Sequence, residues 1–479
     1  MSSITRAPLT AELLSTLESR LVDTRVITKS SPDYQESIAR WSDAAVKQAG
    51  AVLLPSTPED ISTILKFVQE HNIDFAVKGG GHSVSGASSS EDGIVIDLDR
   101  MRAVTVDTEK RIITAQGGAY WADVDTAAAK HGLATVGGTA NHTGIGGLTL
   151  GGGFGWLSGR YGMVVDNLLS ATLVLANGQI VTTSFTENPD LFWAVRGAGH
   201  NFGVAVKFQY RCYEQKNDIF SGLISFTPDK LESVVETLNT IFLEPQMDAA
   251  AICVLSRPPG APVPMVSVLP FYNGPEEVAR SHFKALFDLK PVVDQTAMFP
   301  YVKMNGLTNP MTTHGNRKTL KGTVFAKPLR PSFARSVLNG FTAKLQTDPD
   351  LAGSAIILEF YDMRKVDEVS NTSTAVANRS SKILNGVIVL RWKESSNDAK
   401  YREYGRQLLA TFKDELSTRL AERNLTAEGV SQYMNYAEPG DATVSEIFGQ
   451  NIVRLQQLKA QYDPNCIFDK YHAIKPISS

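Results

Sequence analysis

The first half of the chain alternates short apolar runs with polar, glycine-rich segments. One apolar stripe recurs at helical spacing over 61–68, and Thr57 and Pro58 stand before it as a helix cap and first helical residue. Asn177 and Gly178 separate two apolar runs and predict a β-hairpin. The runs expected to be strands are 52–54, 75–77, 94–96, 112–114, 173–175 and 180–181. This half is therefore expected to be mixed α+β and not an array of βαβ units.

Glycine thins out after about residue 216, and longer patterns take over. We expect strands at 354–361, 387–392 and 432–436, a long amphipathic helix at 402–420 and a last helix at 452–460. A chain of 479 residues is too long for one compact core. We therefore expect three segments, 1–215, 216–425 and 426–479, which pack closely because no repeat or low-complexity linker separates them.

The composition narrows the classes of protein that the chain can represent. Its 43% hydrophobic and 20% charged residues exclude a disordered or fibrous chain, and its net charge of -3 offers no attraction for nucleic acid or an anionic membrane. Glu12, Glu18 and Arg20 interrupt the first amphipathic stretch, so we expect no signal peptide. No apolar run approaches the roughly 20 residues of a membrane span. Three scattered cysteines fit a reducing compartment, and a cytoplasmic location is expected.

Two glycine-rich segments carry the first functional signal. Gly79, Gly80 and Gly81 follow one expected strand, and a second run of glycines extends over 137–155. Glycine lets backbone N–H groups converge on an anion without obstruction by Cβ atoms, as a pyrophosphate requires. One such run is as easily a tight turn, but two ordered runs favour a phosphate-bearing cofactor. Neither forms a strand–GxGxxG–helix unit and no Walker lysine is present, which disfavours a Rossmann fold and a P-loop.

Residues in and around these runs resemble one protein family. They are 77–86, 137–156, 161–167, 188–203, 433–436, 454–455 and 459–464. In this order and spacing they resemble the berberine-bridge-enzyme-like branch of the vanillyl-alcohol-oxidase superfamily, whose flavin domain is of the PCMH type. The resemblance covers about 40–215 and 425–475, and the middle of the chain matches loosely. It implies a two-domain α+β fold, in which one FAD lies between the first domain and an antiparallel sheet of a substrate domain.

The resemblance also implies how the flavin is held. Family members attach flavin carbon C8α to the histidine that stands here as His82; a loop histidine that only forms hydrogen bonds is the alternative. A neutral imidazole is a nucleophile at pH 7, which makes the bond chemically reasonable. Relatives with a second, cysteinyl bond have cysteine where this chain has Ala140, so a single link is expected. The residues expected to contact FAD are Lys78, Gly79, Gly80, Gly81, His82, Ser83, Gly86, Gly138, Thr139, His142, Thr143, Gly144, Gly147, Gly152, Gly155, Gly203, Val204 and Asn435.

Oxidation by a flavin also needs a base for the proton that accompanies the hydride. On a strand at 432–436, Tyr433 and Asn435 would share one face, and Met434 and Tyr436 the other. Relatives place a tyrosine base on this segment, which makes Tyr433 the first candidate. A tyrosine that only packs on the flavin ring is the alternative, and a register error of one residue would give the role to Tyr436.

Other polar residues are expected near the substrate. Glu359 and Tyr361 lie two apart on a strand that resembles the substrate-facing wall of the family, although an exposed sheet carboxylate is the other interpretation. His142 in the second flavin loop is a catalytic candidate or an ordinary hydrogen-bonding residue. Thr143 stands at the oxygen-gating position of the family, which is commonly aliphatic, and this departure leaves the choice between oxidase and dehydrogenase open.

We therefore expect an FAD-dependent oxidoreductase that oxidises an alcohol, amine or activated C–H of a small, secondary-metabolite-like molecule, with hydride transfer to flavin N5 and electrons passing to O2. The alternatives are a non-redox cyclase or ligand-binding protein with a structural flavin, and a dehydrogenase that avoids oxygen. No metal site is expected, because the eight histidines show neither HExxH nor HxH spacing. No GxSxG motif supports a serine hydrolase.

Overall fold

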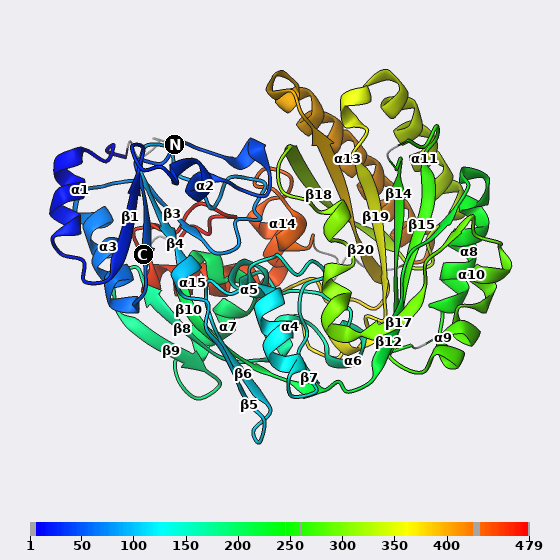
Figure 1. Ribbon diagram of the computed structural model, residues 1–479, viewed down its shortest axis with the longest axis horizontal. Helices are drawn as coiled ribbons and strands as arrows, with labels where there is room; N and C mark the ends of the chain where they lie inside the picture. Colours follow the sequence, from blue (N-terminus) through cyan, green and yellow to red (C-terminus); the bar gives the residue numbers. More distant parts are fainter. Residues whose placement is uncertain (1–5, 245, 259, 425–431, 478–479) are drawn as a thin grey trace.

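The computed structural model describes residues 6–244, 246–258, 260–424 and 432–477. They form two halves that lie side by side, with the two ends of the chain in one half and the middle of the chain in the other (Figure 1). Sheets of four, five and nine strands organise these halves. The mixed α+β, two-domain arrangement expected from the sequence is confirmed.

The four-stranded sheet has the order β1-β2-β4-β3. Its strands are β1 (Thr24–Thr28), β2 (Ala51–Pro55), β4 (Ile94–Asp97) and β3 (Phe75–Lys78), and its helices are α1 (Ala11–Glu18), α2 (Tyr34–Ile38) and α3 (Pro58–Glu70). Thr57 caps α3, as predicted, by accepting a hydrogen bond from the N–H of Asp60. β2 and β3 run parallel to β4, which lies between them. Since β3 ends at Lys78, the first glycine loop begins at the carboxyl edge of these parallel strands.

The five-stranded sheet is antiparallel and has the order β5-β6-β10-β8-β9. Its strands are β5 (Val104–Asp107), β6 (Ile112–Gln116), β10 (Gly203–Arg211), β8 (Leu168–Leu175) and β9 (Ile180–Ser184). The predicted hairpin at Asn177 and Gly178 joins β8 to β9, and Gly178 has a φ of +81°. The accompanying helices are α4 (Trp121–Ala129), α5 (Ile145–Leu150), α6 (Ser158–Tyr161) and α7 (Pro189–Ala198). Short strands β7 (Leu133–Ala134) and β11 (Tyr213–Glu214) pair beside them.

The nine-stranded sheet builds the other half of the molecule. Its strands, in the order along the sheet, are β16 (Val293–Asp294), β13 (Ile224–Phe226), β15 (Met265–Tyr272), β14 (Ala249–Ser256), β19 (Ala355–Tyr361), β20 (Ile383–Trp392) and β18 (Arg317–Ala326), with β12 (Asp218–Ser221) and β17 (Ala297–Pro300) at one side. Its helices are α8 (Leu231–Ile241), α9 (Glu276–His282), α10 (Lys284–Asp288), α11 (Pro331–Thr347), α12 (Arg364–Asp367) and α13 (Asp398–Glu422). The strands predicted at 354–361 and 387–392 and the helix at 402–420 are all present.

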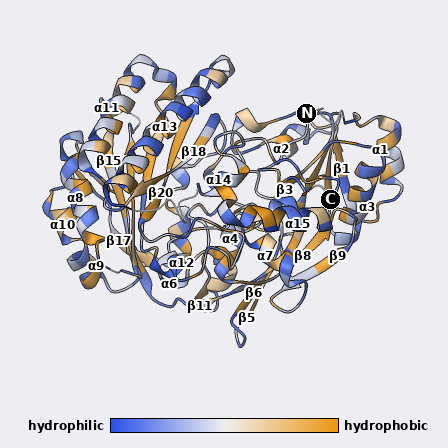
Figure 2. Cartoon of the chain, turned by 180° about the vertical axis from the view of Figure 1, so that it is seen from behind, coloured by the Kyte–Doolittle hydropathy of each residue, from blue (hydrophilic) through white to orange (hydrophobic). Residues whose placement is uncertain are grey.

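Hydrophobic residues concentrate on the strands, whereas the outer helices α8, α11 and α13 carry many hydrophilic turns (Figure 2). α13 packs against β18, and α8 packs against α11. This layering leaves the other face of the large sheet directed toward the glycine loops of the first half. None of the helices in the described parts of the chain has the length and apolar character needed to cross a bilayer.

The C-terminal residues return to the first half, where α14 (Val444–Phe448) and α15 (Ile452–Tyr462) lie. α15 packs against α7. Lys459 is fully buried and donates hydrogen bonds to Asp463 and to the carbonyl oxygens of Asn201 and Phe468. The expected boundary at 425–426 lies outside the described residues.

The strand predicted at 432–436 is wrong. Met434–Tyr436 forms a 3-10 turn, closed by a 3.0 Å hydrogen bond from the N–H of Tyr436 to the carbonyl of Tyr433. The aromatic residues favour a strand locally, but the Asn435 side chain donates to the carbonyl of Leu148 and holds the segment against the second glycine loop. With about three residues per turn, Tyr433 and Tyr436 come together, with ring centroids 4.9 Å apart. This spacing replaces the expected alternation of faces.

Candidate active site

A cavity of about 740 Å³ lies between the two halves. This volume is within the range of cofactor and ligand sites. One wall consists of the glycine loops around 79–83 and 139–148, and the opposite wall is the inner face of the large sheet. Alternate positions of four strands make most of that face apolar, through Ile252, Val254, Leu269, Ile357, Val387 and Val389. An antiparallel sheet therefore covers the loops that are rich in glycine.

The first glycine loop presents backbone N–H groups to this cavity. Within the described residues, the N–H groups of 80–83 donate to no protein acceptor. Gly81 has a φ of +67°, which a residue with a Cβ rarely adopts. A Cβ on Gly80 would lie 2.3 Å from the backbone nitrogen of Gly144, so the two loops touch where no side chain fits. Several free donors at the end of a strand form the cradle that a phosphate group requires.

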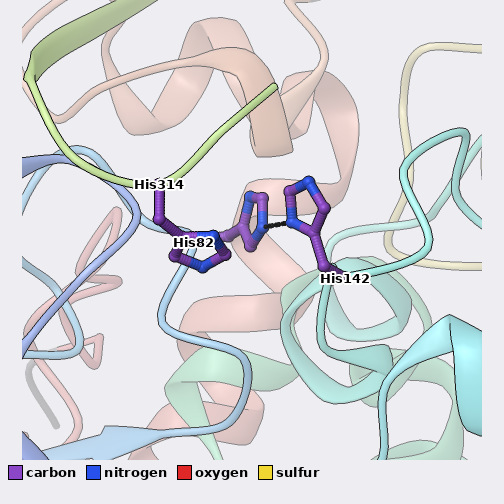
Figure 3. A group of neighbouring side chains, drawn as sticks. All are labelled: His82, His142 and His314. Carbon is purple, nitrogen blue, oxygen red and sulfur yellow. Dashed lines mark hydrogen bonds between the residues drawn. The ribbon is translucent and has the colours of Figure 1, made fainter. Parts of the chain in front are cut away.

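His82 lies in this loop with its ring held from two sides. The indole of Trp41 stacks on it, with 5.1 Å between ring centroids and 15° between planes. His82 Nε2 lies 2.7 Å from Nδ1 of His142, which comes from the second glycine loop (Figure 3). Burial lowers the pKa of His82 well below its ordinary 6.5, and the neighbouring His142, His314 and Lys318 lower it further. The imidazole is therefore neutral at pH 7 and available as a nucleophile.

A third histidine, His314, completes a cluster that the sequence spacing does not reveal. Its ring centroid is 5.8 Å from that of His82 and 5.1 Å from that of His142, and one nitrogen of each ring lies within 4.8 Å of the others. Such a group has the composition of a metal site. The 2.7 Å between His82 and His142 is a hydrogen-bond distance, however, whereas two nitrogens on one tetrahedral zinc lie about 3.3 Å apart. The present geometry suits a hydrogen bond better than an ion.

Tyr433 lies at another part of the cavity, beside the second glycine loop. Its hydroxyl oxygen accepts hydrogen bonds from the N–H of Gly153 over 3.0 Å and from Asn435 Nδ2 over 2.8 Å. Its ring packs edge-on against Phe154. Burial raises the pKa of Tyr433. These contacts anchor the loop, and the base role predicted for Tyr433 stays a prediction.

Tyr436 and Glu359 form a second polar pair on the cavity wall. The phenol of Tyr436 donates to Glu359 Oε1 over 2.7 Å. Glu359 is 3% exposed, and its Oε2 has no hydrogen-bond partner within the described residues. Burial raises the pKa of this carboxyl group to about 7, although the hydrogen bond from Tyr436 opposes the shift. A carboxylate with one unsatisfied oxygen and a pKa near neutrality has the properties of a proton acceptor.

The same chain segments match known families. Residues 49–184 match the family described as FAD binding domain, and residues 432–475 match the family described as berberine and berberine like. The FAD-linked oxidoreductase pgmH of Aspergillus terreus is 35% identical to this chain over 93% of its residues and 92% of the relative. This chain belongs to the berberine-bridge-enzyme-like FAD-linked oxidoreductases. It is therefore a flavoprotein and an oxidoreductase.

Solved structures show the same fold for this FAD-linked oxidoreductase. Berberine-bridge-enzyme-like 1 of Physcomitrella patens superposes with a TM-score of 0.84, at 19% identity over 98% of this chain and 99% of the other. Glucooligosaccharide oxidase of Acremonium strictum, which has a 6-S-cysteinyl, 8α-N1-histidyl FAD, superposes with a TM-score of 0.83, at 21% identity over 98% and 100%. These likenesses establish the architecture of the flavin domain and of the sheet that covers it.

Most residues of the oxidoreductase that the sequence predicts as flavin contacts line the cavity. They are Gly79, Gly80, Gly81, His82, Ser83, Thr139, Thr143, Gly144, Gly147, Gly203, Val204 and Asn435. The others lie behind this lining and are Lys78, Gly86, Gly138, His142, Gly152 and Gly155. Lys78, for example, forms an ion pair with the buried carboxylate of Asp97 over 2.7 Å. These residues support the loops instead of facing the cavity.

The remaining candidates of the oxidoreductase divide in the same way. Glu359 lines the cavity, but Tyr361 does not: its ring lies beside Trp156, and its buried hydroxyl has no partner in the described part of the chain. Ala140 lines the cavity, whereas Cys212 and Cys253 are buried outside its lining. A single histidyl link therefore stays a prediction.

Several site residues of the oxidoreductase carry no signal in the sequence. Trp41 and His314 come from irregular segments far from either glycine run. Thr312, whose Oγ1 lies 3.0 Å from His142 Nε2, comes from the middle of the chain. Spacing along the chain could not find them, because Trp41 meets His82 only when the first half folds, and His314 and Thr312 reach the two histidines from the middle of the chain. Tyr436 was visible as the neighbour of Tyr433, and the 3-10 turn explains why it reaches the cavity.

Proposed function

We propose that this protein is an FAD-linked oxidase with its flavin attached through His82, and that it oxidises an alcohol, amine or activated C–H of a small secondary-metabolite-like molecule. O2 is the proposed electron acceptor. The observation that carries the proposal is one cavity that contains a phosphate cradle, a neutral nucleophilic histidine and a paired carboxylate. FAD, when bound, supplies the two-electron acceptor. The residues of the chain bind it, orient the substrate and take up the proton.

The proposed covalent link rests on the state of His82. Its ring is neutral at pH 7, stacked on Trp41 and next to the free N–H groups of the cradle. The histidyl FAD of the structurally similar glucooligosaccharide oxidase supports the same chemistry here. Because Ala140 offers no thiol, we propose a single bond.

The Tyr436–Glu359 pair is the proposed proton acceptor. Both residues line the cavity, and an ionised Glu359 holds the Tyr436 phenol by its proton. The oxygen of Tyr436 could take the substrate proton while its own phenolic proton passes to Glu359, or Glu359 Oε2 could take the substrate proton directly. Either route would leave a neutral carboxyl group in a buried site. That outcome is favourable because burial disfavours the ionised form. Tyr433 is the alternative base.

The cavity wall indicates what the substrate contains. The inner sheet face is apolar, which suits an aromatic or alicyclic ring. Arg391 also lines this cavity; its Nη2 donates to the carbonyl of Met311, while its buried Nε has no hydrogen-bond partner within the described residues. No carboxylate of the described chain forms an ion pair with Arg391, and burial lowers the pKa of its guanidinium. We propose that a substrate oxygen, such as a carboxylate, phenolate or carbonyl, completes its hydrogen bonding.

An anaerobic screen tests this function. Purified protein is mixed with aromatic and alicyclic alcohols, amines and phenols, each as an acid and as its methyl ester, and loss of the oxidised-flavin absorbance is followed. We expect bleaching by some of these compounds, faster for acids than for esters, and rapid return of the absorbance on admission of air. Turnover of a compound without bleaching would support the non-redox alternative. Bleaching with slow return in air would identify a dehydrogenase.

A further inference from the structure

A line of hydrogen bonds runs from His82 through His142 and Thr312 and ends on the backbone carbonyl of Thr308. His82 Nε2 lies 2.7 Å from His142 Nδ1, and His142 Nε2 lies 3.0 Å from Thr312 Oγ1. Thr312 Oγ1 donates to the carbonyl oxygen of Thr308 over 3.0 Å. In Figure 3 the rings of His82 and His142 lie next to each other, and a dashed line marks the hydrogen bond between them.

The carbonyl end of this line determines where each proton is. A carbonyl oxygen only accepts, so the Thr312 hydroxyl gives its single proton to Thr308. Thr312 Oγ1 then accepts from His142, which puts the ring proton of His142 on Nε2 and leaves its Nδ1 as an acceptor. His142 Nδ1 accepts in turn from Nε2–H of His82. A neutral His82 therefore carries its proton on Nε2, and its Nδ1 has a free lone pair.

The surroundings favour the uncharged rings that this assignment requires. Burial is the main reason for the low pKa of both His82 and His142. The fully buried Lys318 adds a positive charge nearby, with Nζ 4.6 Å from the Trp41 ring centroid. Burial lowers the pKa of Lys318 itself to about 7, so its ammonium is present in the acidic range, where the imidazoles would otherwise gain a proton.

Trp41 opposes rotation of the His82 ring, which would carry Nε2 away from Nδ1 of His142. The stacked indole limits the ring to one plane. The indole N–H donates to the carbonyl of Thr312 over 2.7 Å, so the stacking residue is tied to the residue that ends the hydrogen-bond line. Thr312 belongs to the middle of the chain, which forms the half with the nine-stranded sheet. The arrangement therefore forms only when both halves are packed together.

We propose that His142 and Thr312 are positioning residues for covalent attachment of FAD: they fix the tautomer of His82 that attacks through Nδ1, and His142 receives the Nε2 proton as the bond forms. This inference rests on the proposed histidyl link. In the overall reaction, Nδ1 of His82 becomes bonded to the flavin 8-methyl carbon. Two hydrogens are lost, one from this methyl carbon and one from Nε2 of His82. Dioxygen takes up the two electrons and two protons and leaves as hydrogen peroxide.

The test follows the rate of attachment separately from FAD binding. Total FAD is read by absorbance of the native protein, and attached FAD by intact mass of the denatured chain, at successive times in air. His142→Ala removes the acceptor, and His142→Asn retains an acceptor near the position of Nδ1 that takes up no proton. We expect both variants to bind FAD. Attachment should slow by roughly 100-fold or more in His142→Ala, because loss of a general base usually reduces a rate by this factor. It should slow less in His142→Asn.

Imidazole added to His142→Ala provides a readout that a purely structural role would not move. The truncated side chain leaves room for the ring, so we expect imidazole to accelerate attachment in this variant and to leave the wild-type rate unchanged.

The pair Thr312→Val and Thr312→Ser tests the next step. Valine removes the acceptor for His142 Nε2–H and should slow attachment, whereas serine keeps the hydroxyl and should match the wild type.

His131→Leu is the control, because His131 is an exposed histidine that belongs neither to the cavity lining nor to the histidine cluster. It should attach FAD at the wild-type rate. Attachment by His142→Ala at that rate would overturn the inference and leave the proposed link intact. If His142→Ala does not fold, equal rates for Thr312→Val and Thr312→Ser overturn it. Wild-type chains without attached FAD, and with one bound zinc, would overturn both proposals and assign the cluster to a metal.

Discussion

Tyr436 donates its phenolic hydrogen to Glu359 Oε1 over 2.7 Å, across 77 positions of sequence. Tyr436 comes from the C-terminal turn that lies against the second glycine loop, and Glu359 from β19 of the large sheet. The pair therefore joins the two walls of the cavity. Because the second carboxylate oxygen has no partner in the described chain, Glu359 keeps one site free for a proton.

Substitution of the pair should slow the chemical step and not cofactor binding. Tyr436→Phe and Glu359→Gln keep the shapes of the side chains and remove the proton acceptor. We expect each to reduce the rate of anaerobic flavin reduction on the order of 100-fold, with normal FAD content. Stopped-flow absorbance measures this rate.

Tyr433→Phe is the comparison variant for this prediction. It removes an oxygen that accepts from Gly153 and Asn435, so we expect it to loosen the loop and to change flavin reduction only modestly. A greater loss in Tyr433→Phe than in Tyr436→Phe would return the base role to Tyr433.

The rate of flavin reduction should depend on the ionisation of Glu359. Its pKa is raised to about 7, and only the ionised form accepts a proton. We therefore expect the rate to rise with pH through about 7 and then to level off. The pH profile of Glu359→Gln should lack this limb; a limb that persists in the variant would assign it to another group.

Glu359 should also make stability depend on pH. Its folded-state pKa of about 7 exceeds the ordinary 4.5, so the folded protein binds this proton more readily than the unfolded chain between these values. The contribution to stability is full below about pH 4.5 and is lost as pH rises through 7. We expect Glu359→Gln to raise the free energy of unfolding at pH 8 by on the order of 2–3 kcal/mol. At pH 4.5 the gain should vanish, as thermal denaturation at the two pH values would show; an equal gain at both would contradict the prediction.

His82 should be the only residue to which FAD is covalently bonded. Acid-precipitated wild-type chains should keep their yellow colour, and peptide mapping should find FAD on the His82 peptide. His82→Ala should still bind FAD in the cradle but release all of it on denaturation. Ala140→Cys tests the second position, since a thiol there would face the cavity and permit a second bond. Flavin on Cys212, Cys253 or Cys466 of the wild type would contradict a single histidyl link.

Contact between the glycine loops should be essential for binding FAD. A Cβ at Gly80 or Gly144 would lie 2.3 Å from a backbone nitrogen of the other loop, and neither backbone can yield without moving the cradle. We expect Gly80→Ala and Gly144→Ala to lose most bound FAD. Gly340→Ala is the control, because that helical glycine has nothing within 4 Å of an added Cβ and should bind FAD normally. Normal FAD content in all three would contradict the prediction.

The sequence alone determined the features that depend on neighbours along the chain. The capped helix after Thr57, the hairpin at Asn177 and Gly178, and the strand before the first glycine loop follow from local backbone preferences. The glycine runs indicated a phosphate-bearing cofactor for the same reason, since successive N–H groups form the cradle. The family resemblance, now shown, added FAD and His82.

The tertiary structure decided which distant side chains meet. The segment after residue 431 reads as a strand by its aromatic residues, but hydrogen bonds to the glycine loop turn it into a 3-10 turn and bring Tyr436 to Glu359. His142 and Thr312 form a line of hydrogen bonds with His82 because two separate halves pack together. Spacing in sequence contains no information on such contacts, which arise from burial and hydrogen bonding between segments far apart in the chain.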